Sequence, residues 1–74
     1  MGVDDITMMN VQALADLLHE AEEHHGPYEK LAQPHNWWDW YAAYVSARQS
    51  GDTPAEASAT AGHHMKEAFG VLPR

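Results

Sequence analysis

The spacing of apolar residues along the chain predicts helices and gives almost no signal for strands. In the first part of the chain, apolar residues recur at steps of three and four, which places them on one face of a helix. These residues are Val11, Leu14, Leu17, Leu18 and Ala21. Acidic residues fall mainly on the opposite side, and no useful length of chain alternates apolar and polar residues as a half-buried strand does.

The first helix is expected over about 11–25. Asn10 can cap its free N–H groups, and Gly26 suits the position just past a helix end. Pro27 strengthens the predicted stop, because proline cannot continue the ladder of backbone hydrogen bonds. A short further turn of helix is expected over 27–32.

Two more helices are expected over about 37–50 and 54–69. Asn36 is a candidate cap for the second helix. The third has the clearest start in the chain, since the sequence TPAE at Thr53–Glu56 matches a capping box with proline at the first helical position. Gly70 follows the last apolar position and predicts the helix end.

These elements predict one all-α domain over 10–70, with a flexible N-terminus over 1–9 and a tail over 71–74. The fold is expected to be a small three-helix bundle, or a helical hairpin with an added helix. A chain of 74 residues buries a smaller fraction of its surface than a larger domain does, and it has no cysteine to form disulfides. We therefore expect oligomerisation, or a metal held by His and carboxylates, to complete the core.

The charge of the chain narrows its partners. The net charge is −7, with positive residues only at Lys30, Arg48, Lys66 and Arg74. Four scattered cations form no basic surface, so nucleic acid and anionic membranes are not expected partners. No apolar run approaches the roughly 20 residues of a membrane span. The acidic start lacks the features of a signal peptide, and a cytoplasmic protein is expected.

The segment PHNWWDWYAAY, over 34–44, gathers most of the aromatic residues. Trp37, Tyr41 and Tyr44 share a helical face, which we expect to pack on the third helix. The small face of that third helix is predicted to comprise Ala57, Ala61, Met65 and Ala68. Trp38 and Trp40 point elsewhere, and a lone three-helix monomer is not expected to cover both. An interface with a second copy or another protein would bury them. The candidate interface residues are Trp37, Trp38, Trp40, Tyr41, Tyr44, Tyr28 and His25.

His25 is in register with the apolar face of the first helix, so it is expected at the edge of the core. A structural role is favoured, in which it caps carbonyls at the helix end and packs on Tyr28 or a tryptophan. The alternative is a general base or a pH-sensitive contact, because imidazole titrates near neutrality.

Histidines and carboxylates three or four residues apart could also bind a divalent metal in a helical protein. The candidates are His19, Glu22, Glu23, His25, His63, His64 and Glu67. Such neighbours are also common on solvated helices, which is the favoured interpretation. No cofactor is therefore predicted, and a metal site at a dimer interface is kept as an alternative.

Motifs for catalysis are absent from the sequence, which has no phosphate-binding glycine loop, no His-Glu-x-x-His and no nucleophile elbow. The leading hypothesis is a small acidic accessory module without catalysis, self-associating through its aromatic helix. The alternatives are a His/carboxylate metal protein and a small-molecule pocket between subunits.

Part of the chain, over about 18–66, resembles a short helical segment of actinobacterial proteins. That segment occurs alone or after a glyoxalase/bleomycin-resistance type domain. The matching features are His25-Gly26, Tyr28-Glu29, the Trp37–Tyr41 block, Tyr44, Arg48 and the turn from Gly51 to Ala57. The resemblance implies an appended or free-standing accessory module and no catalytic residues, since the metal ligands of glyoxalases belong to a β-rich domain.

Overall fold

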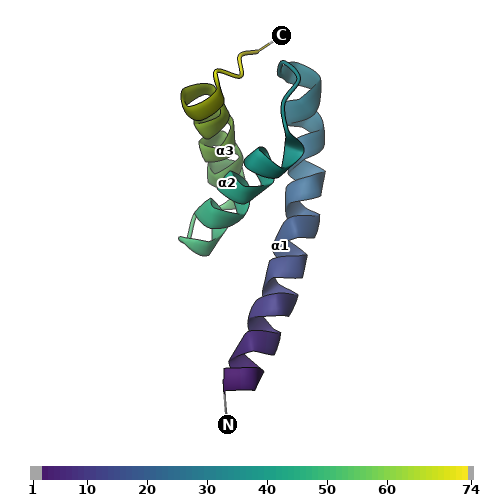
Figure 1. The fold of residues 1–74 in the computed structure, drawn as a ribbon, viewed down its shortest axis with the longest axis vertical. Helices are drawn as coiled ribbons and strands as arrows, with labels where there is room; N and C mark the ends of the chain where they lie inside the picture. The colour runs from purple at the N-terminus through teal and green to yellow at the C-terminus, as the bar shows by residue number, and fades with distance from the viewer. Residues whose placement is uncertain (1–2, 74) are drawn as a thin grey trace.

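The fold is a bundle of three helices, seen in a computed structural model that describes the backbone of residues 3–73 and the side chains of residues 11–73. The helices are α1 (Val3–Leu31), α2 (Trp37–Gln49) and α3 (Pro54–Phe69) (Figure 1). The all-α prediction is confirmed. The molecule measures 50 × 20 × 19 Å, because α1 extends well beyond the other two helices. Among the residues described, no helix has both the length and the apolar character needed to cross a membrane.

The predicted bounds of the first helix are wrong at both ends. The helix begins at Val3, so Asn10 lies inside it and most of the segment predicted as a flexible N-terminus is helical. Residues 1–2 lie outside the described chain. At the other end, α1 continues through Pro27 to Leu31 instead of stopping after residue 25.

Tertiary packing explains why α1 continues through Pro27. A proline inside a helix costs about 3 kcal/mol, because it removes one hydrogen bond and crowds the preceding turn. Pro27 and Glu23, whose carbonyl loses that bond, are both exposed, so water can reach the carbonyl. One residue later, Tyr28 packs on Trp40 with ring centroids 5.7 Å apart. This contact requires the helical turn to be kept.

The second and third helices match their predicted ranges. Asn36 occupies the cap position of α2 in extended backbone, although its side chain makes no capping hydrogen bond. In α3 the capping box is complete: Glu56 N–H donates to Thr53 Oγ1 at 3.2 Å, and Thr53 N–H donates to Glu56 Oε1 at 2.9 Å. Gly70 ends α3 in the left-handed conformation, with φ of 67°.

The core lies where α2 packs against both α1 and α3. It comprises Ala21, Trp40, Tyr44, Val45, Ala47, Ala57, Ala61 and Met65. Small residues on α3 leave room for the rings of α2, as the sequence predicted, except that Ala68 is exposed. Gly62 likewise lies close to Tyr28, where an added methyl group would sit 3.5 Å from the ring.

The tryptophans are distributed differently from the prediction. Trp40 is completely buried, whereas Trp37, which was expected in the core, is 54% exposed. Trp40, Tyr44 and Ala47 follow one another at steps of four and three, and this is the face that the other helices cover. Trp37 stands one turn earlier, at the end of that face, and is therefore less enclosed.

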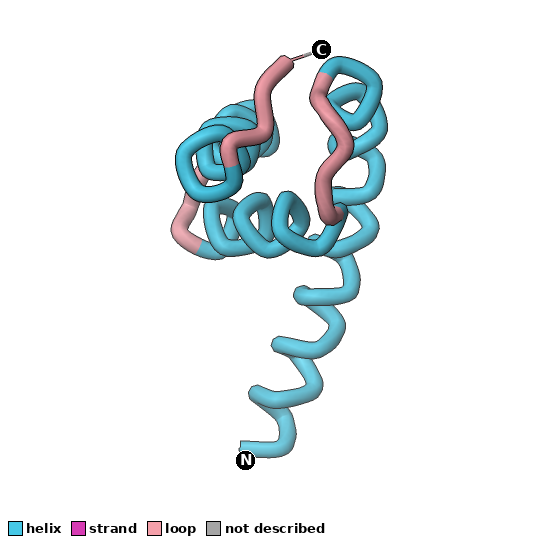
Figure 2. The backbone as a smooth tube through the Cα atoms, turned by 45° about the horizontal axis from the view of Figure 1, so that its top comes forward, coloured by secondary structure: helices cyan, strands magenta, loops and turns pink. Residues whose placement is uncertain are grey.

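A clasp joins the end of the described chain to the connection between α1 and α2. Gln33 N–H donates to the carbonyl of Leu72 at 2.9 Å, and Leu72 N–H donates to Gln33 Oε1 at 3.1 Å. Ala32 and Pro73 form an isolated antiparallel bridge beside these bonds. The two loop segments consequently lie side by side (Figure 2).

Candidate functional site

The apolar face predicted on the first helix is only partly covered. Ala21 is buried in the core and Leu17 packs against it. Val11, Leu14 and Leu18, which were expected to be buried, are 62%, 41% and 42% exposed. The reason is that α2 and α3 pack only beside the second half of α1 (Figure 1). Val11, Leu14 and Leu18 therefore remain open to solvent.

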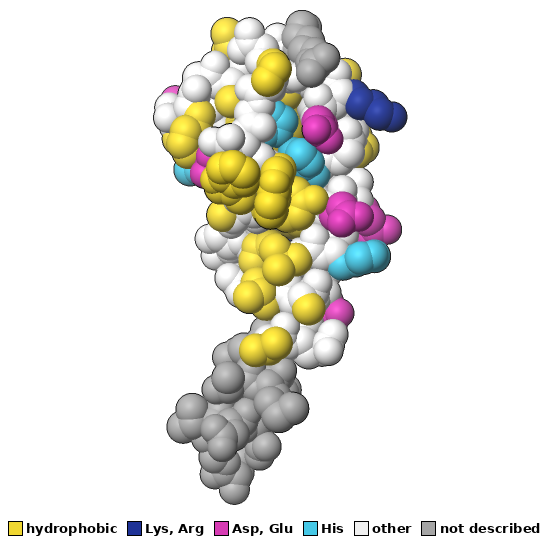
Figure 3. Space-filling model, turned by 45° about the vertical axis from the view of Figure 1, so that its right-hand side comes forward, with side chains coloured by type: hydrophobic (Ala, Val, Ile, Leu, Met, Phe, Trp, Pro, Cys, Tyr) yellow, Lys and Arg dark blue, Asp and Glu magenta, His cyan; other side chains and the backbone are white. Residues whose placement is uncertain are grey.

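Two tryptophans at the start of α2 add an aromatic end to this surface. Trp37 and Trp38 are each about half exposed, and their rings meet edge to face with centroids 5.5 Å apart. Hydrophobic side chains gather along α1 and continue onto the start of α2 (Figure 3). We call Val11, Leu14, Leu18, Trp37 and Trp38 together the apolar strip.

The helical spacing of α1 links the two ends of the strip. Glu22 follows Leu18 by four residues, so it lies one turn further along the same face. Glu22 and Trp37 line one open hollow at the surface. The carboxylate of Glu22 therefore stands between the aliphatic end of the strip and its aromatic end.

That hollow has an unusual combination of walls. It encloses about 430 Å³ and is lined by Glu22, His25, Glu29, Trp37 and Tyr41. The rings of Trp37 and Tyr41 meet at 72° with centroids 5.0 Å apart, giving two perpendicular aromatic walls. We call this surface the aromatic–acidic hollow.

His25 is the buried member of the hollow, with 6% of its surface exposed. Its Nε2 lies 2.8 Å from Nε2 of His35, and Nδ1 of His35 lies 2.9 Å from the carbonyl of Gln33. A carbonyl only accepts, so His35 carries a proton on Nδ1. With both rings neutral, Nε2 of His35 accepts the proton of His25 Nε2. This leaves a lone pair on His25 Nδ1, which lies 3.9 Å from Glu29 Oε2.

The environment of His25 agrees with part of its prediction. Its ring packs on Trp40 at 5.2 Å and on Tyr28 at 6.2 Å, as expected for a structural histidine. It does not cap a helix end, because α1 continues past it. Burial, and to a smaller degree the neighbouring His35, lower the pKa of His25 below its ordinary value. The ring is therefore neutral at neutral pH.

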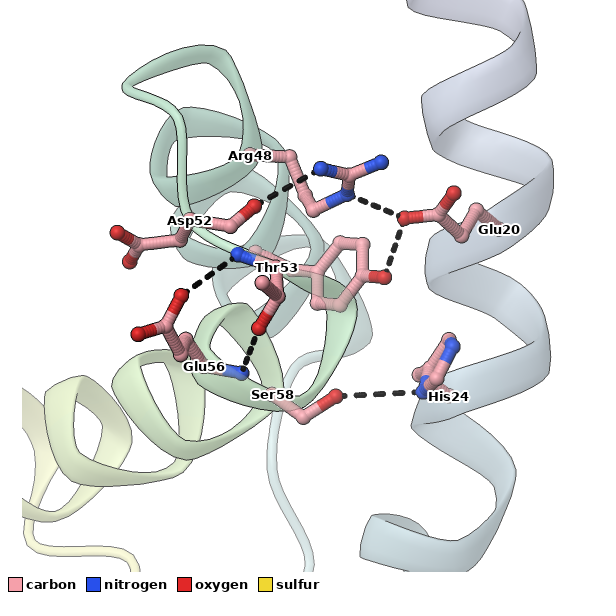
Figure 4. Close-up of polar contacts among 8 residues, drawn as sticks. Glu20, His24, Arg48, Asp52, Thr53, Glu56 and Ser58 are labelled. Atoms are coloured by element: carbon pink, nitrogen blue, oxygen red, sulfur yellow. Dashed lines mark hydrogen bonds and ion pairs between the residues drawn. The ribbon is translucent and has the colours of Figure 1, made fainter.

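Glu20 forms a polar centre that sequence reasoning missed (Figure 4). Its Oε1 accepts from Tyr44 Oη at 2.5 Å and from Arg48 Nε at 2.7 Å. Arg48 also donates to the carbonyl of Asp52 at 2.8 Å. The hydrogen bonds from Arg48 and Tyr44 lower the pKa of Glu20. The position of Arg48 beside Tyr44 on α2 was the one signal that an acid of α1 would lie opposite.

Tyr44 belongs to this centre and to the core, and it is not an exposed binding residue. Burial and the hydrogen bond to Glu20 raise its pKa to about 12. The adjacent His24 stacks on the Tyr44 ring at 5.5 Å, and its Nδ1 lies 3.3 Å from Ser58 Oγ (Figure 4). These contacts tie α1 to α2 and α3.

The structure brings two of the predicted metal ligands, Glu22 and His25, to one hollow, and it does not gather the others there. His19 and Glu23 face each other at 4.0 Å on α1, and His63 and Glu67 do so at 3.9 Å on α3, all four exposed. His64 instead packs edge to face on Phe69. In the part of the chain that is described, no group of three or more His, Asp or Glu side chains could hold a metal ion.

Comparison with protein-family models, with curated proteins and with solved structures gave no match. The resemblance to an actinobacterial accessory segment therefore stays a prediction. Two surfaces of the molecule, the apolar strip and the aromatic–acidic hollow, carry the features that bear on function.

Proposed function

We propose that this protein is a small interaction module that self-associates into a two-fold dimer through the apolar strip. The observation that carries this proposal is the exposure of Val11, Leu14 and Leu18, which no other described part of the chain covers. No catalytic step is assigned to it.

The exposed half of α1 has a physical need for a partner. Isolated helices shorter than about 12–15 residues are marginal in water, and most helical stability in proteins comes from packing an apolar face. The other two helices pack only beside the second half of α1 (Figure 1). Contiguous apolar surface of this kind marks interaction sites on soluble proteins. A partner that covers the strip would stabilise the helix as well as bind it.

A second copy of the chain suits the strip because its two ends differ. In a two-fold dimer the same surface is used twice, so a residue at one end of the strip contacts the partner at the other end. With two α1 helices antiparallel, Leu14 and Leu18 of one copy would pack on Trp37 and Trp38 of the other. Tryptophan contributes a large share of the binding energy at such interfaces.

Charge gives a way to separate this occupant from a different protein. Each copy carries a net charge of −7, so two copies repel each other. Added salt screens this repulsion, and raising NaCl from about 20 mM to about 500 mM is expected to strengthen self-association. A complex with a basic partner would be weakened by the same change.

Sedimentation velocity at micromolar concentrations tests the proposal. The wild-type chain is expected to be a dimer, and Leu14→Glu or Leu18→Glu is expected to be monomeric because each places a charge within the strip. Leu31→Glu is the matched control, since Leu31 is exposed on α1 outside the strip and should leave the dimer intact. A monomeric wild-type chain, or a dimer unaffected by Leu14→Glu, would contradict the proposal.

A further inference from the structure

The aromatic–acidic hollow is a second surface whose chemistry points to a ligand. We propose that it binds a guanidinium group, the planar cation at the end of an arginine side chain. This inference does not rest on self-association, because four of the five lining residues, Glu22, His25, Glu29 and Tyr41, lie outside the apolar strip. Trp37 belongs to both surfaces, so a dimer that covers Trp37 would compete with a ligand in the hollow.

Two acceptors in the hollow face each other with no donor between them when His25 and His35 are both neutral. In that state Nδ1 of His25 holds a lone pair, because the Nε2 proton of His25 is donated to His35 at 2.8 Å. Opposite it, at 3.9 Å, lies a carboxylate oxygen of Glu29, which also only accepts. This separation is too long for a hydrogen bond. A ligand with several N–H groups would satisfy both atoms at once.

The burial of His25 distinguishes this pair of acceptors from a contact between two exposed side chains. His25 exposes 6% of its surface, yet it lines the open hollow. Its pKa is lowered, first by burial and then by His35, so the ring does not supply the missing proton at neutral pH. The acceptor on Nδ1 is therefore kept available for an external donor.

The acidic residues of the hollow give it a negative charge. Glu22 and Glu29 both line the hollow, and their charges add to burial in raising the pKa of Tyr41. The negative potential therefore reaches the aromatic wall. Among the described residues that line the hollow, none is a lysine or an arginine that would neutralise it. A cation is the ligand that this potential favours.

The aromatic walls and the acceptors of the hollow together favour a guanidinium over other cations. The faces of tryptophan and tyrosine attract cations, and guanidinium groups also stack on them. Trp37 and Tyr41 stand perpendicular to each other at 5.0 Å and give such a group a flat wall and an edge. A guanidinium presents five N–H donors in one plane, which suits two carboxylates and one imidazole. A quaternary ammonium has no donor for these three acceptors.

An NMR titration with two model compounds tests the proposal. N-acetyl-arginine amide carries the guanidinium, whereas N-acetyl-citrulline amide has nearly the same shape without the charge. The arginine compound is expected to shift the ring signals of His25 and Trp37 saturably, with an affinity at least tenfold higher than that of the citrulline compound. Equal affinity for the two compounds, or no saturable shift with either, would overturn the proposal.

Variants localise the effect to the hollow. The double variant Glu22→Gln/Glu29→Gln is expected to lose at least tenfold in affinity for the arginine compound. The control Glu23→Gln/Glu67→Gln removes the same charge from exposed positions outside the hollow and is expected to bind as the wild type does. Similar losses in both variants would show a general charge effect and would overturn the site.

Two further measurements separate the source of the cation and the role of dimerisation. A peptide with a central arginine that binds more tightly than N-acetyl-arginine amide would assign the guanidinium to a protein partner, whereas equal affinity would assign it to a small molecule.

Repeating the titration with Leu14→Glu separates the two proposals. The arginine selectivity is expected to persist in that variant, and its loss there would overturn the independence of the site.

Discussion

Trp40 stacks face to face on Tyr44, with ring centroids 5.2 Å apart and ring planes 13° from parallel. Both rings are completely buried, and together with Met65 they are the largest fully buried side chains. The indole Nε1 of Trp40 has no hydrogen-bond partner among the described residues. The centre of the bundle thus depends on ring packing more than on the polar group that the indole carries.

Shortening Trp40 is expected to destabilise the fold in a graded way. Trp40→Ala should cost about 3–5 kcal/mol, a large part of the stability of a small domain. Trp40→Phe should cost less, about 1–2 kcal/mol, because it also removes an unpaired buried N–H group. Urea denaturation followed by circular dichroism measures both. Trp38→Phe, at a half-exposed ring, should change stability by no more than about 0.5 kcal/mol, and equal costs at the two positions would contradict this account.

Glu20 is expected to make stability depend on pH in the acidic range. Its pKa in the folded state is lowered by the hydrogen bonds from Arg48 and Tyr44. The contribution is therefore fully present above the ordinary carboxyl value of 4.5 and is lost as pH falls through the lower folded-state value. Glu20→Gln should cost on the order of 1 kcal/mol at pH 7, and the cost should become smaller as pH falls below 4.5.

Denaturation of the wild type and the variant across pH 3–7 checks this dependence. Glu23→Gln is the control, since Glu23 is exposed and its ion pair is with the exposed His19. A constant difference between wild type and Glu20→Gln over the whole range would exclude the proposed ion pair as the cause.

The pKa of His25 is expected to lie below the ordinary value of a histidine. The groups facing it are Glu29, Glu22, His35 and Tyr41 in and beside the hollow, with Tyr28 on its own helix. Burial dominates and lowers its pKa, so the unfolded chain takes up the proton first as pH falls below about 6.5. His25 therefore leaves the free energy of unfolding unchanged above that pH and reduces it as pH falls below it. NMR titration of the His25 ring protons, compared with the same histidine in a short unfolded peptide, should show His25 of the folded protein titrating at lower pH.

The third helix could be predicted from the sequence because its limits are written locally. Thr53, Pro54 and Glu56 specify the first turn, and Gly70 the last, with no help from the rest of the chain. The end of α1 could not be predicted in this way. Gly26 and Pro27 are local stop signals, but the packing of Tyr28 on Trp40 outweighs them.

The candidate site shows the same limit. Helical spacing placed His25 near the core, but it could not show that His35 would meet it, because the contact depends on how the chain turns between α1 and α2. Spacing also grouped Trp37 with Tyr41 correctly, while assigning Trp37 instead of Trp40 to the core. Which of two adjacent helical faces is buried depends on the crossing of three helices, and this has no signature in the order of residues.

The clasp between Gln33 and Leu72 determines which segments lie together at one end of the molecule. It holds the end of the described chain beside the end of α1, while the start of α1 lies at the far end of a body 50 Å long. In the proposed antiparallel dimer, the clasp of each copy would lie beside the start of α1 of the other copy. A fluorescent label at the clasp of one copy would then be a neighbour of the first described turn of α1 in the other copy, and remote from that turn in its own copy.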